Sequence, residues 1–186
     1  MSLFDLVNKP YYNFLRACFS SWPVDAFDSF HELVDCWLSF LQPWKLVNTT
    51  FSDSWIAFVE NNFVYYIQLL HLFLKVSVHM DYTSARDAQT LIKVVSFFSE
   101  PNLYSVLLES EKRLLSYLLS ASQFPGQIGG HQIGAAMWNS CKFIAGSHIE
   151  YTPLLQGETV AVVRQLVQKL KVESIIRFAN NNLVGY

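Results

Sequence analysis

The stretch between Trp22 and Lys45 constrains the fold more than any other part of the chain, because it has the pattern of one helix with both ends marked. Its apolar residues recur at spacings of three and four, as on the buried face of a helix: Phe27, Phe30, Val34, Trp37 and Leu41. Its acidic residues recur at the same spacings in a different phase: Asp25, Asp28, Glu32 and Asp35. The pattern predicts an amphipathic helix with one core face and one acidic face.

Both ends of this helix carry residues that suit helix boundaries. Pro23 and Asp25 suit a helix start, because proline is tolerated in the first turn and an aspartate side chain can accept a bond from an early backbone N–H. Gln42 followed by Pro43 suits the end, since proline has no N–H to donate and disfavours helix in the residue before it. We therefore expect a helix over about residues 25 to 41.

The same helical spacing recurs along most of the chain, and few segments have the alternation of a strand. We predict an all-α fold. It would be a single helical domain over residues 1–186 with about six to eight helices, and a helical-repeat-like stack is one arrangement of them. Helices are expected near residues 11–20, 25–41, 63–80 and 84–98, and from Trp55, from Pro101 and from about Val160.

Polar residues mark the expected boundaries in the first half of the chain. Ser52 or Asp53 would cap a helix that begins at Trp55. That helix could run straight into the 63–80 segment or break at residues 60–62, whose sequence is Glu-Asn-Asn. The pattern leaves both alternatives open.

Two further helix starts are expected later in the chain. Ser84 and Asp87 resemble a capping box for a helix that ends near Phe98, and Pro101 suits the first turn of the next helix. That next helix has an apolar face made of Leu103, Leu107, Leu114, Leu115 and Leu118. The last long helix repeats the pattern and could continue or restart through Ile175 and Ile176; its apolar face would comprise Val160, Val163, Leu166, Val167 and Leu170.

The composition is apolar, with 52% hydrophobic residues and only 15% charged residues, against about 25% in an average protein. So few charges indicate either a part of a larger protein, whose faces neighbours cover, or a surface that meets a partner or a bilayer. We favour the first alternative. The net charge of −2 lacks the basic stripe that neutralises phosphates, which predicts no nucleic-acid partner.

Three cysteines, Cys18, Cys36 and Cys141, form no C-x-x-C pair. An odd number without such a pair argues against a disulfide framework and against a zinc site, and we expect reduced thiols in a domain that faces the cytosol. Cys36 lies near the core face of its helix, where a free cysteine commonly behaves as a small hydrophobe. The N-terminal residues lack the pattern of a secretory signal.

Residues 63–80 come nearest to a membrane span, since eighteen helical residues reach about 27 Å. Four polar residues form a stripe along one face of this segment: Gln68, His71, Lys75 and His79. A lysine near the centre of a span costs about 2.5 kcal/mol or more. We therefore interpret the segment as an amphipathic core helix.

Two groups of side chains are candidates for a metal site, and both are poorly spaced. The acidic stripe extends over about 15 Å of helix, so no more than two adjacent carboxylates could share one ion, and a solvated face or a docking face for a basic partner is favoured. His71 and His79 would share a face with Lys75 but lie about 12 Å apart, too far for one metal. A polar face is favoured there.

A glycine-rich connector is expected at about residues 122–150. His131, His148 and Glu150 lie in or beside it, and we considered each histidine as a general acid or base against an ordinary surface histidine. Residues 129–134, Gly-Gly-His-Gln-Ile-Gly, lack the strand, lysine and hydroxyl of a phosphate loop and are interpreted as connector. No nucleophile motif is present, so the catalytic, cofactor-binding and metal-binding residues are unknown.

Several motifs follow one another in an order that resembles a known family. They are Trp22-Pro23-Val24-Asp25, residues 37–45 (Trp-Leu-Ser-Phe-Leu-Gln-Pro-Trp-Lys), Trp55, residues 58–61 (Phe-Val-Glu-Asn), Tyr66, residues 101–103 (Pro-Asn-Leu) and residues 151–153 (Tyr-Thr-Pro). The chain resembles, over roughly residues 11–170, an internal segment of the sphingomyelin phosphodiesterase 4 family, also called neutral sphingomyelinase 3. Members of that family are much longer and end in a hydrophobic membrane anchor.

The resemblance implies a hydrolase that converts sphingomyelin to ceramide and phosphocholine with magnesium as cofactor. It implies membranes of the endoplasmic reticulum and nuclear envelope, with the chain facing the cytosol, and a sphingomyelin or membrane surface as partner. No catalytic residue can be carried over to this sequence. The alternative function is a non-catalytic helical scaffold that binds protein partners or membrane surfaces.

Overall fold

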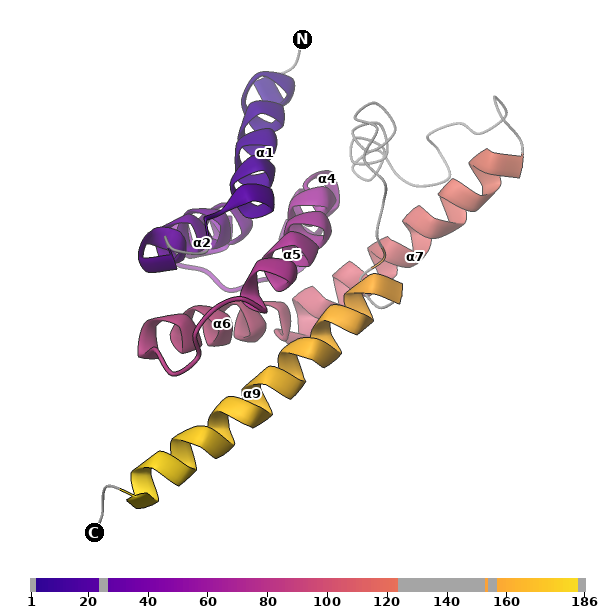
Figure 1. Ribbon diagram of the computed structural model, residues 1–186. Coiled ribbons are helices and arrows are strands. Elements are labelled where there is room, and N and C mark those ends of the chain that lie inside the picture. The colour runs from indigo at the N-terminus through magenta and orange to yellow at the C-terminus, as the bar shows by residue number, and fades with distance from the viewer. Residues whose placement is uncertain (1–2, 24–26, 124–152, 154–156, 184–186) are drawn as a thin grey trace. The chain divides into compact units, whose positions relative to one another are not determined.

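A computed structural model describes residues 3–23, 27–123, 153 and 157–183 of the chain (Figure 1). Eight α-helices and one short 3-10 helix occupy nearly all of these residues, and no strand occurs among them. The helices are α1 (Leu3–Ser21), α2 (Phe27–Leu41), α3 (Pro43–Leu46), α4 (Ile56–Asn61), α5 (Phe63–Ser77), α6 (Ala85–Phe98), α7 (Pro101–Gln123) and α9 (Gly157–Leu183). The all-α prediction and the predicted number of helices are confirmed.

The helix expected at residues 11–20 is longer than predicted. α1 begins at Leu3 and contains Pro10. A proline inside a helix loses one backbone hydrogen bond and crowds the preceding turn. The buried face of α1, which includes Tyr12, Leu15 and Phe19, stabilises the helix by tertiary packing that outweighs this cost.

The end of α2 lies where the sequence predicted it. The helix ends at Leu41, and Gln42 leaves helical geometry with φ −122° and ψ 55° before Pro43 begins α3. The carbonyl oxygen of Leu41 accepts a hydrogen bond of 2.7 Å from the buried hydroxyl group of Tyr66. A carbonyl left over at the helix end is thereby satisfied inside the protein.

The start of the next helix differs from the prediction. Asp53–Trp55 forms a 3-10 helix, and α4 begins at Ile56. The Ser52 side chain makes no capping bond and instead lies 2.9 Å from the hydroxyl of Ser54. The expectation that Ser52 or Asp53 caps an α-helix from Trp55 is therefore wrong, because the serine hydroxyl bonds locally within the 3-10 turn.

The helix is interrupted between α4 and α5. Of the two alternatives left open, a break within residues 60–62 or one continuous helix, the structure has the break. Asn62 lies between the helices, and its side chain donates 2.9 Å to the carbonyl of Phe58. The neighbouring Asn61 side chain donates 2.8 Å to the carbonyl of Ala57. Both amides therefore add side-chain bonds to carbonyls of the last turn of α4, next to the break.

The predicted capping box at Ser84 and Asp87 forms a different bond. α6 begins at Ala85, as expected, but the Asp87 carboxylate accepts its hydrogen bond of 2.9 Å from the backbone N–H of Asp81. Asp87 is buried, and the Asp81 N–H lies in the turn that precedes the helix. The acid therefore fixes the turn between α5 and α6 rather than the first residue of α6.

α7 begins at Pro101 as predicted. The Glu100 carboxylate accepts 2.6 Å from the N–H of Leu103, which caps the helix start. Leu103, Leu107 and Leu114 are buried on the predicted apolar face. α7 continues to Gln123, so the expected connector begins later than residue 122, and the rest of it lies outside the described residues.

The last helix is continuous through Ile175 and Ile176, but its predicted apolar face is only partly buried. Leu166 is buried, whereas Val163 and Val167 are 40% and 45% exposed. The prediction that all five apolar residues face the core is wrong for these two valines. Successive residues advance by about 100° around a helix, so both valines lie to one side of Leu166 on the helix surface.

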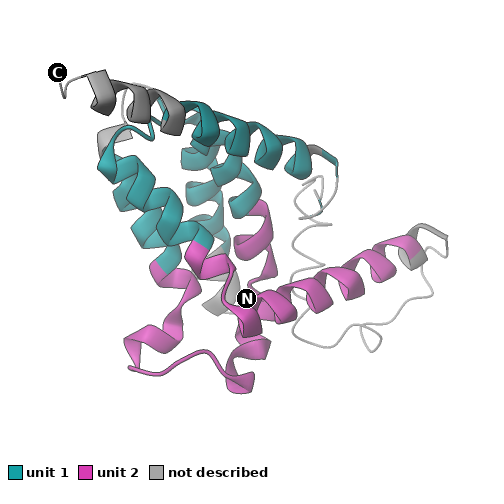
Figure 2. Cartoon of the chain, turned by 90° about the horizontal axis from the view of Figure 1, so that it is seen from below, with its two compact units in different colours: residues 1–38, 69–95, 152–186 teal, residues 39–68, 96–151 magenta. Residues whose placement is uncertain are grey.

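The described residues form two compact units (Figure 2). Unit 1 comprises residues 1–38, 69–95 and 152–186, and unit 2 comprises residues 39–68 and 96–151. The predicted boundaries of a single domain over residues 1–186 stay a prediction.

Aromatic rings form the centre of unit 1. Phe19 of α1 lies edge-on to Phe30 and Trp37 of α2, with ring centroids 5.7 Å and 5.3 Å away. Phe73 of α5 stacks on Phe30 at 6.2 Å and lies 6.0 Å from Trp37. All four side chains have no more than 1% of their surface exposed, which confirms the predicted core face of α2.

A second aromatic cluster holds unit 2 together. Trp44 of α3 contacts Phe51, Trp55 and Phe97, at centroid distances of 5.1, 6.1 and 6.4 Å. Phe97 also stacks on Tyr66 at 6.3 Å. Pairs of this geometry contribute about 0.5–1.5 kcal/mol beyond the area that they bury.

α5 is a core helix, as predicted, but two residues of the polar stripe are buried with the apolar ones. Its apolar residues are buried on more than one side, and even Gln68 and His71 have only 6% and 5% of their surface exposed. No single helix among the described residues is long and apolar enough to cross a membrane. α6 and residues 101–119 of α7 meet the length and composition of a span only when taken together, with a bend between them.

Candidate functional site

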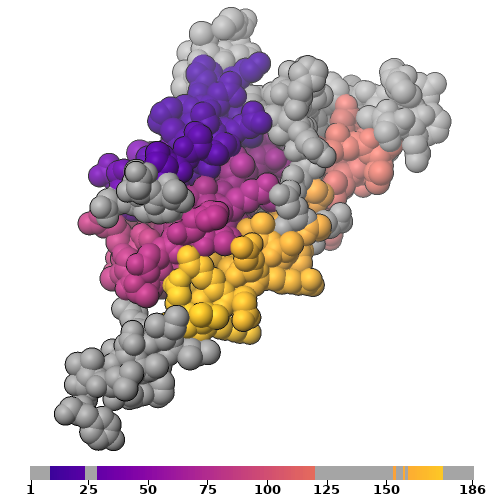
Figure 3. Space-filling model, viewed as in Figure 1, coloured from indigo at the N-terminus to yellow at the C-terminus, as the bar shows by residue number. Residues whose placement is uncertain are grey.

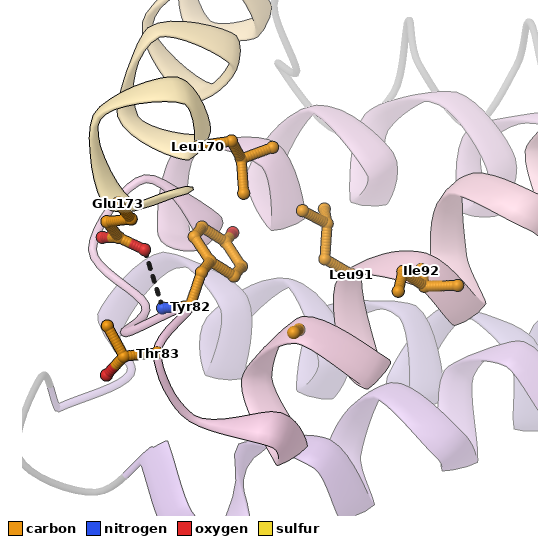
Figure 4. Close-up of a pocket in the computed structure, with 7 residues that line it drawn as sticks. Tyr82, Thr83, Leu91, Ile92, Leu170 and Glu173 are labelled. Carbon is orange, nitrogen blue, oxygen red and sulfur yellow. Dashed lines mark hydrogen bonds between the residues drawn. The ribbon is translucent and has the colours of Figure 1, made fainter. Parts of the chain in front are cut away.

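A pocket of about 250 Å³ in unit 1 is the candidate site (Figure 4). It lies between the turn after α5, the first half of α6 and the described part of α9, and its lining is mostly apolar. The lining residues are Tyr82, Thr83, Ala88, Leu91, Ile92, Leu170 and Glu173. Small-molecule sites usually measure about 300–1,000 Å³, so this pocket suits one apolar part of a larger ligand.

Lys169 fixes α9 against the turn after α5. Its Nζ atom donates 2.9 Å to the carbonyl of Val78 and donates a second bond to the carbonyl of Met80. The same ammonium group lies 5.5 Å from the ring centre of Tyr82. Carbonyls that follow a helix end have no intrahelical partner, and a lysine satisfies them with a favourable charge interaction. Figure 3 shows the described side chains of α9 in orange to yellow.

Glu173 lies one helical turn after Lys169 and binds the same segment. Its Oε2 atom accepts 3.1 Å from the backbone N–H of Tyr82, which Figure 4 marks with a dashed line. Its Oε1 atom lies 3.5 Å from the Lys169 ammonium group. The carboxylate is therefore already held by one N–H and one cation at the pocket wall.

Tyr82 forms the inner wall of the pocket. Its hydroxyl donates 2.6 Å to the carbonyl of Ser77, the last residue of α5. Burial raises the pKa of the Tyr82 phenol well above its ordinary value of 10.0. The ring therefore stays neutral at physiological pH and contributes an apolar surface.

The two acids near the pocket also hold backbone groups. Asp81 accepts from the hydroxyl of Thr83 at 2.7 Å and from its N–H at 2.9 Å, and these bonds lower the pKa of the Asp81 carboxyl. Asp87 accepts from the Asp81 N–H. Among the described residues no group of three His, Cys, Asp or Glu side chains could hold a metal ion. These acids thus hold the turn through their hydrogen bonds.

The acidic stripe on α2 is partly described. Glu32 is exposed, and Asp35 forms an ion pair with Lys93 of α6. The side chains of Asp25 and Asp28 lie outside the described residues. Asp35 is thus paired within the chain, and the docking of a basic partner by this face stays a prediction.

His71 and His79 do not share a helix face. α5 ends at Ser77, so His79 lies in the following turn and is exposed, whereas His71 is buried in the helix. The Nδ1 atom of His71 lies 2.9 Å from the hydroxyl of Thr159 in α9. The prediction of a shared face was wrong because α5 ends at Ser77, three residues before the end of the predicted segment 63–80.

The other candidates from the sequence are the three cysteines and the residues of the glycine-rich connector. Cys36 is exposed rather than near the core, because it lies about 100° around the helix from the buried Trp37. Cys18 is partly buried. Cys141 and residues 129–134 lie outside the described residues. The same holds for His131, His148 and Glu150.

Lys169, Glu173 and Tyr82 were not singled out from the sequence. Lys169 and Glu173 have the i, i+4 spacing of a helical ion pair, which was a local signal. Their contact with the turn joins residues that are about 90 positions apart in sequence. Such a contact has no counterpart in local spacing, and only the tertiary structure shows it.

Comparison with protein families decides the relationship of this chain. A model of the family described as mitochondrial-associated sphingomyelin phosphodiesterase matches residues 2–128, more than half of the chain. The chain belongs to this family. The match contains the turn after α5 and the part of α6 that line the pocket, and it confirms the resemblance seen in the sequence.

The relatives are proteins named sphingomyelin phosphodiesterase 4. The protein from Danio rerio is 32% identical over 120 residues, covering 59% of this chain and 15% of the relative. The protein from Homo sapiens is 28% identical over 189 residues, covering 87% and 22%. The protein from Xenopus laevis is 30% identical over 121 residues, covering 59% and 14%.

The chain thus matches less than a quarter of the length of these relatives. No solved structure matches the chain.

Proposed function

We propose that the chain serves as a helical segment of a sphingomyelin phosphodiesterase, which hydrolyses sphingomyelin to ceramide and phosphocholine. The family match over residues 2–128 carries this proposal. The names of the relatives support the same reaction and the same lipid substrate. Because the chain corresponds to a small part of those relatives, the activity of the whole protein is part of the proposal.

The pocket supports a contact with the apolar part of a lipid. Leu91, Ile92 and Leu170 give it apolar walls, and its polar groups, Glu173 and the Tyr82 N–H, are bonded to each other. Such a lining favours hydrocarbon over a charged phosphocholine group. We assign the pocket a binding role and no step of the hydrolysis.

Hydrolysis of a phosphodiester needs an activated water and a cation that meets the phosphate charge. Magnesium is the cofactor that the resemblance implies. Four described acids do not fit it, because Asp81, Asp87 and Glu173 each hold a backbone N–H and Asp35 holds a lysine. The proposal therefore places the reacting groups on residues other than these acids. The cytosolic side of the endoplasmic reticulum and nuclear envelope is the proposed location, on the basis of the resemblance.

Turnover of labelled sphingomyelin tests the proposal. The 186-residue chain and a longer protein that contains it are assayed for released phosphocholine, with magnesium and with a chelator. We expect magnesium-dependent release by the longer protein. If neither protein releases phosphocholine under any condition, the hydrolase proposal is wrong.

A pair of variants tests the role of the pocket in that assay. Ala88→Leu places a larger side chain on the pocket wall, whereas Ala85→Leu makes the same change at the exposed start of α6. We expect Ala88→Leu in the longer protein to raise KM for sphingomyelin and leave kcat near its original value. Equal kinetics for the two variants would contradict the binding role.

The second candidate function is a non-catalytic scaffold for protein partners or membrane surfaces. Exposed apolar residues on α6 and α9 favour it, among them Ile92 at 62% and Val167 at 45%. Specific binding of a partner together with absent turnover in the longer protein would support the scaffold and exclude the hydrolase.

A further inference from the structure

The end of α3 and the turn that follows it expose two adjacent large apolar side chains. Leu46 has 79% of its surface exposed and Val47 has 58%. Leu46 is more exposed than any other large hydrophobic residue whose burial the structure describes. Nothing within the described part of the chain covers these two side chains. Burying them in a partner would remove apolar surface from water, which is favourable.

Hydrogen bonds hold this turn in one conformation. The N–H of Thr49 donates 2.9 Å to the carbonyl of Trp44, and the N–H of Asn48 donates 3.2 Å to the carbonyl of Lys45. Asn48 has a φ of 52°, in the left-handed region that asparagine tolerates better than most residues. This is the Schellman arrangement of a helix end, so Leu46 and Val47 are exposed on an ordered turn.

The base of the turn is also fixed. The Thr49 hydroxyl donates a second bond, of 3.1 Å, to the Trp44 carbonyl. The Trp44 ring is 5% exposed and packs against Phe51 and Trp55, both of which are partly exposed. The two apolar side chains therefore stand on a rigid aromatic base.

The residues around the two apolar side chains are polar and nearly balanced in charge. Four exposed residues without formal charge follow them or lie nearby: Asn48, Thr49, Thr50 and Ser52. Lys45 and Asp53 are exposed and of opposite sign. We call these six residues the polar collar. A stable protein interface buries about 800 Å² on each partner, which is far more than two side chains surrounded by this collar can provide.

We propose that this turn, residues 44–55, inserts Leu46 and Val47 into the interfacial layer of a zwitterionic lipid bilayer. The inference rests on the proposed function, because sphingomyelin is a zwitterionic lipid that lies in a bilayer. The polar collar matches the headgroup layer, and Trp55 is the residue type that favours the boundary between headgroups and hydrocarbon. The balanced charges give no preference for an anionic surface.

Flotation with vesicles tests the proposal. The 186-residue chain is mixed with vesicles of phosphatidylcholine and sphingomyelin, and the bound fraction is measured for the original chain and for Leu46→Glu and Val47→Glu. Phe14→Glu is the matched control, because Phe14 is 56% exposed, close to the 58% of Val47, and lies on α1. We expect each change in the turn to weaken vesicle binding by about tenfold or more, and the control to keep binding within about twofold.

Salt concentration and fold are measured in the same series. Binding by insertion is expected to persist in high NaCl, because screening weakens charge attraction and leaves apolar insertion intact. Circular dichroism and thermal unfolding should match among all variants, since the altered side chains are exposed. Absence of vesicle binding by the original chain, equal binding by the turn variants, or binding that disappears in high salt would each overturn the proposal.

Turnover separates this proposal from the hydrolase proposal. In the longer protein, Leu46→Glu is expected to slow hydrolysis of sphingomyelin in vesicles and to leave hydrolysis of a short-chain, monomeric sphingomyelin unchanged. Vesicle binding that depends on Leu46 without any turnover would remove the hydrolase proposal and keep the insertion. Self-association that Leu46→Glu abolishes, without vesicle binding, would assign the turn to a second copy of the chain instead.

Discussion

His71 donates a hydrogen bond from Nδ1 to the hydroxyl oxygen of Thr159, 2.9 Å away and 88 positions later in the sequence. The direction follows from the second bond of the threonine, whose hydroxyl donates 3.0 Å to the carbonyl of Pro153. A hydroxyl group has one hydrogen to donate, so its oxygen accepts from His71. The geometry therefore assigns the Nδ1 proton to His71 and ties α5 to the start of α9.

Thr159→Val should lower the free energy of unfolding by about 1–3 kcal/mol. The valine keeps the size of the side chain but removes the acceptor of the His71 N–H and the donor to Pro153, and a buried polar group without its partner is costly. Thr50→Val is the control, because Thr50 is exposed. Urea unfolding measures both changes, and equal midpoints for the two variants would contradict the role of this bond.

The ion pair between Glu60 and Arg113 should stabilise unit 2 far more than the pair between Glu109 and Lys112. The Glu60 side chain is 11% exposed, whereas those of Lys112 and Glu109 are 74% and 61% exposed. Arg113→Met leaves a buried carboxylate without its cation and should cost about 2–3 kcal/mol. Lys112→Met should change the free energy of unfolding by less than about 0.5 kcal/mol. Chemical unfolding distinguishes them, and similar losses would refute the ranking.

Lys169 should protect the turn after α5 from local opening. Lys169→Met removes the donor to the carbonyls of Val78 and Met80 and should cost about 1–3 kcal/mol. Arg164→Met, at an exposed cation on the same helix, is the control. Hydrogen exchange gives a local readout, because Glu173→Ala should speed exchange of the Tyr82 amide that the carboxylate binds. Unchanged exchange at that amide would show that the bond does not hold the turn.

Alkaline pH should destabilise the protein through Tyr12. Burial raises the pKa of this phenol from 10.0 to about 12. Between these two values the unfolded chain would lose the proton while the folded protein keeps it, so stability falls as pH rises. Tyr12→Phe should make this fall shallower, as urea unfolding across that pH range would show. An unchanged slope would mean that Tyr12 does not contribute.

Acidic pH should destabilise the protein through Asp81. Hydrogen bonds from the hydroxyl and N–H of Thr83 lower the pKa of the Asp81 carboxyl below its ordinary value of 3.8. The stabilising contribution is present above that ordinary value and is lost as pH falls through the lowered one. Thr83→Val should raise the pKa of Asp81 towards 3.8, measured by titration of the carboxyl signal in NMR. A titration identical to that of the original protein would exclude the hydroxyl as a cause.

Local spacing in the sequence was enough to predict several elements. The core face of α2 with Phe30 and Trp37, the helix end at Leu41 and the start of α7 at Pro101 all follow from side-chain periodicity and from the missing N–H of proline. The errors occur where packing outweighs local preference. Pro10 lies inside α1 and Val163 is exposed on α9, and neither follows from the spacing of neighbours.

Most contacts of the candidate site could not be predicted from the sequence. Glu173 and Lys169 are separated by one helical turn, so their mutual contact was accessible from spacing, but their contact with the turn at Tyr82 was not. The same is true of His71, whose partner Thr159 lies on another helix. A hydrogen bond between distant residues depends on how the chain returns, which local periodicity does not describe.

The sequence alone determined the helical class, the positions of most helices and, through the order of its motifs, the family of the chain. These properties depend on the period of side chains around a helix and on residue identity, both of which are local. Only the tertiary structure decided where polar groups find partners, which acids are already engaged, and that Leu46 and Val47 stand exposed on a rigid turn. Burial and partner choice depend on contacts between distant segments, and those contacts exist only in the folded protein.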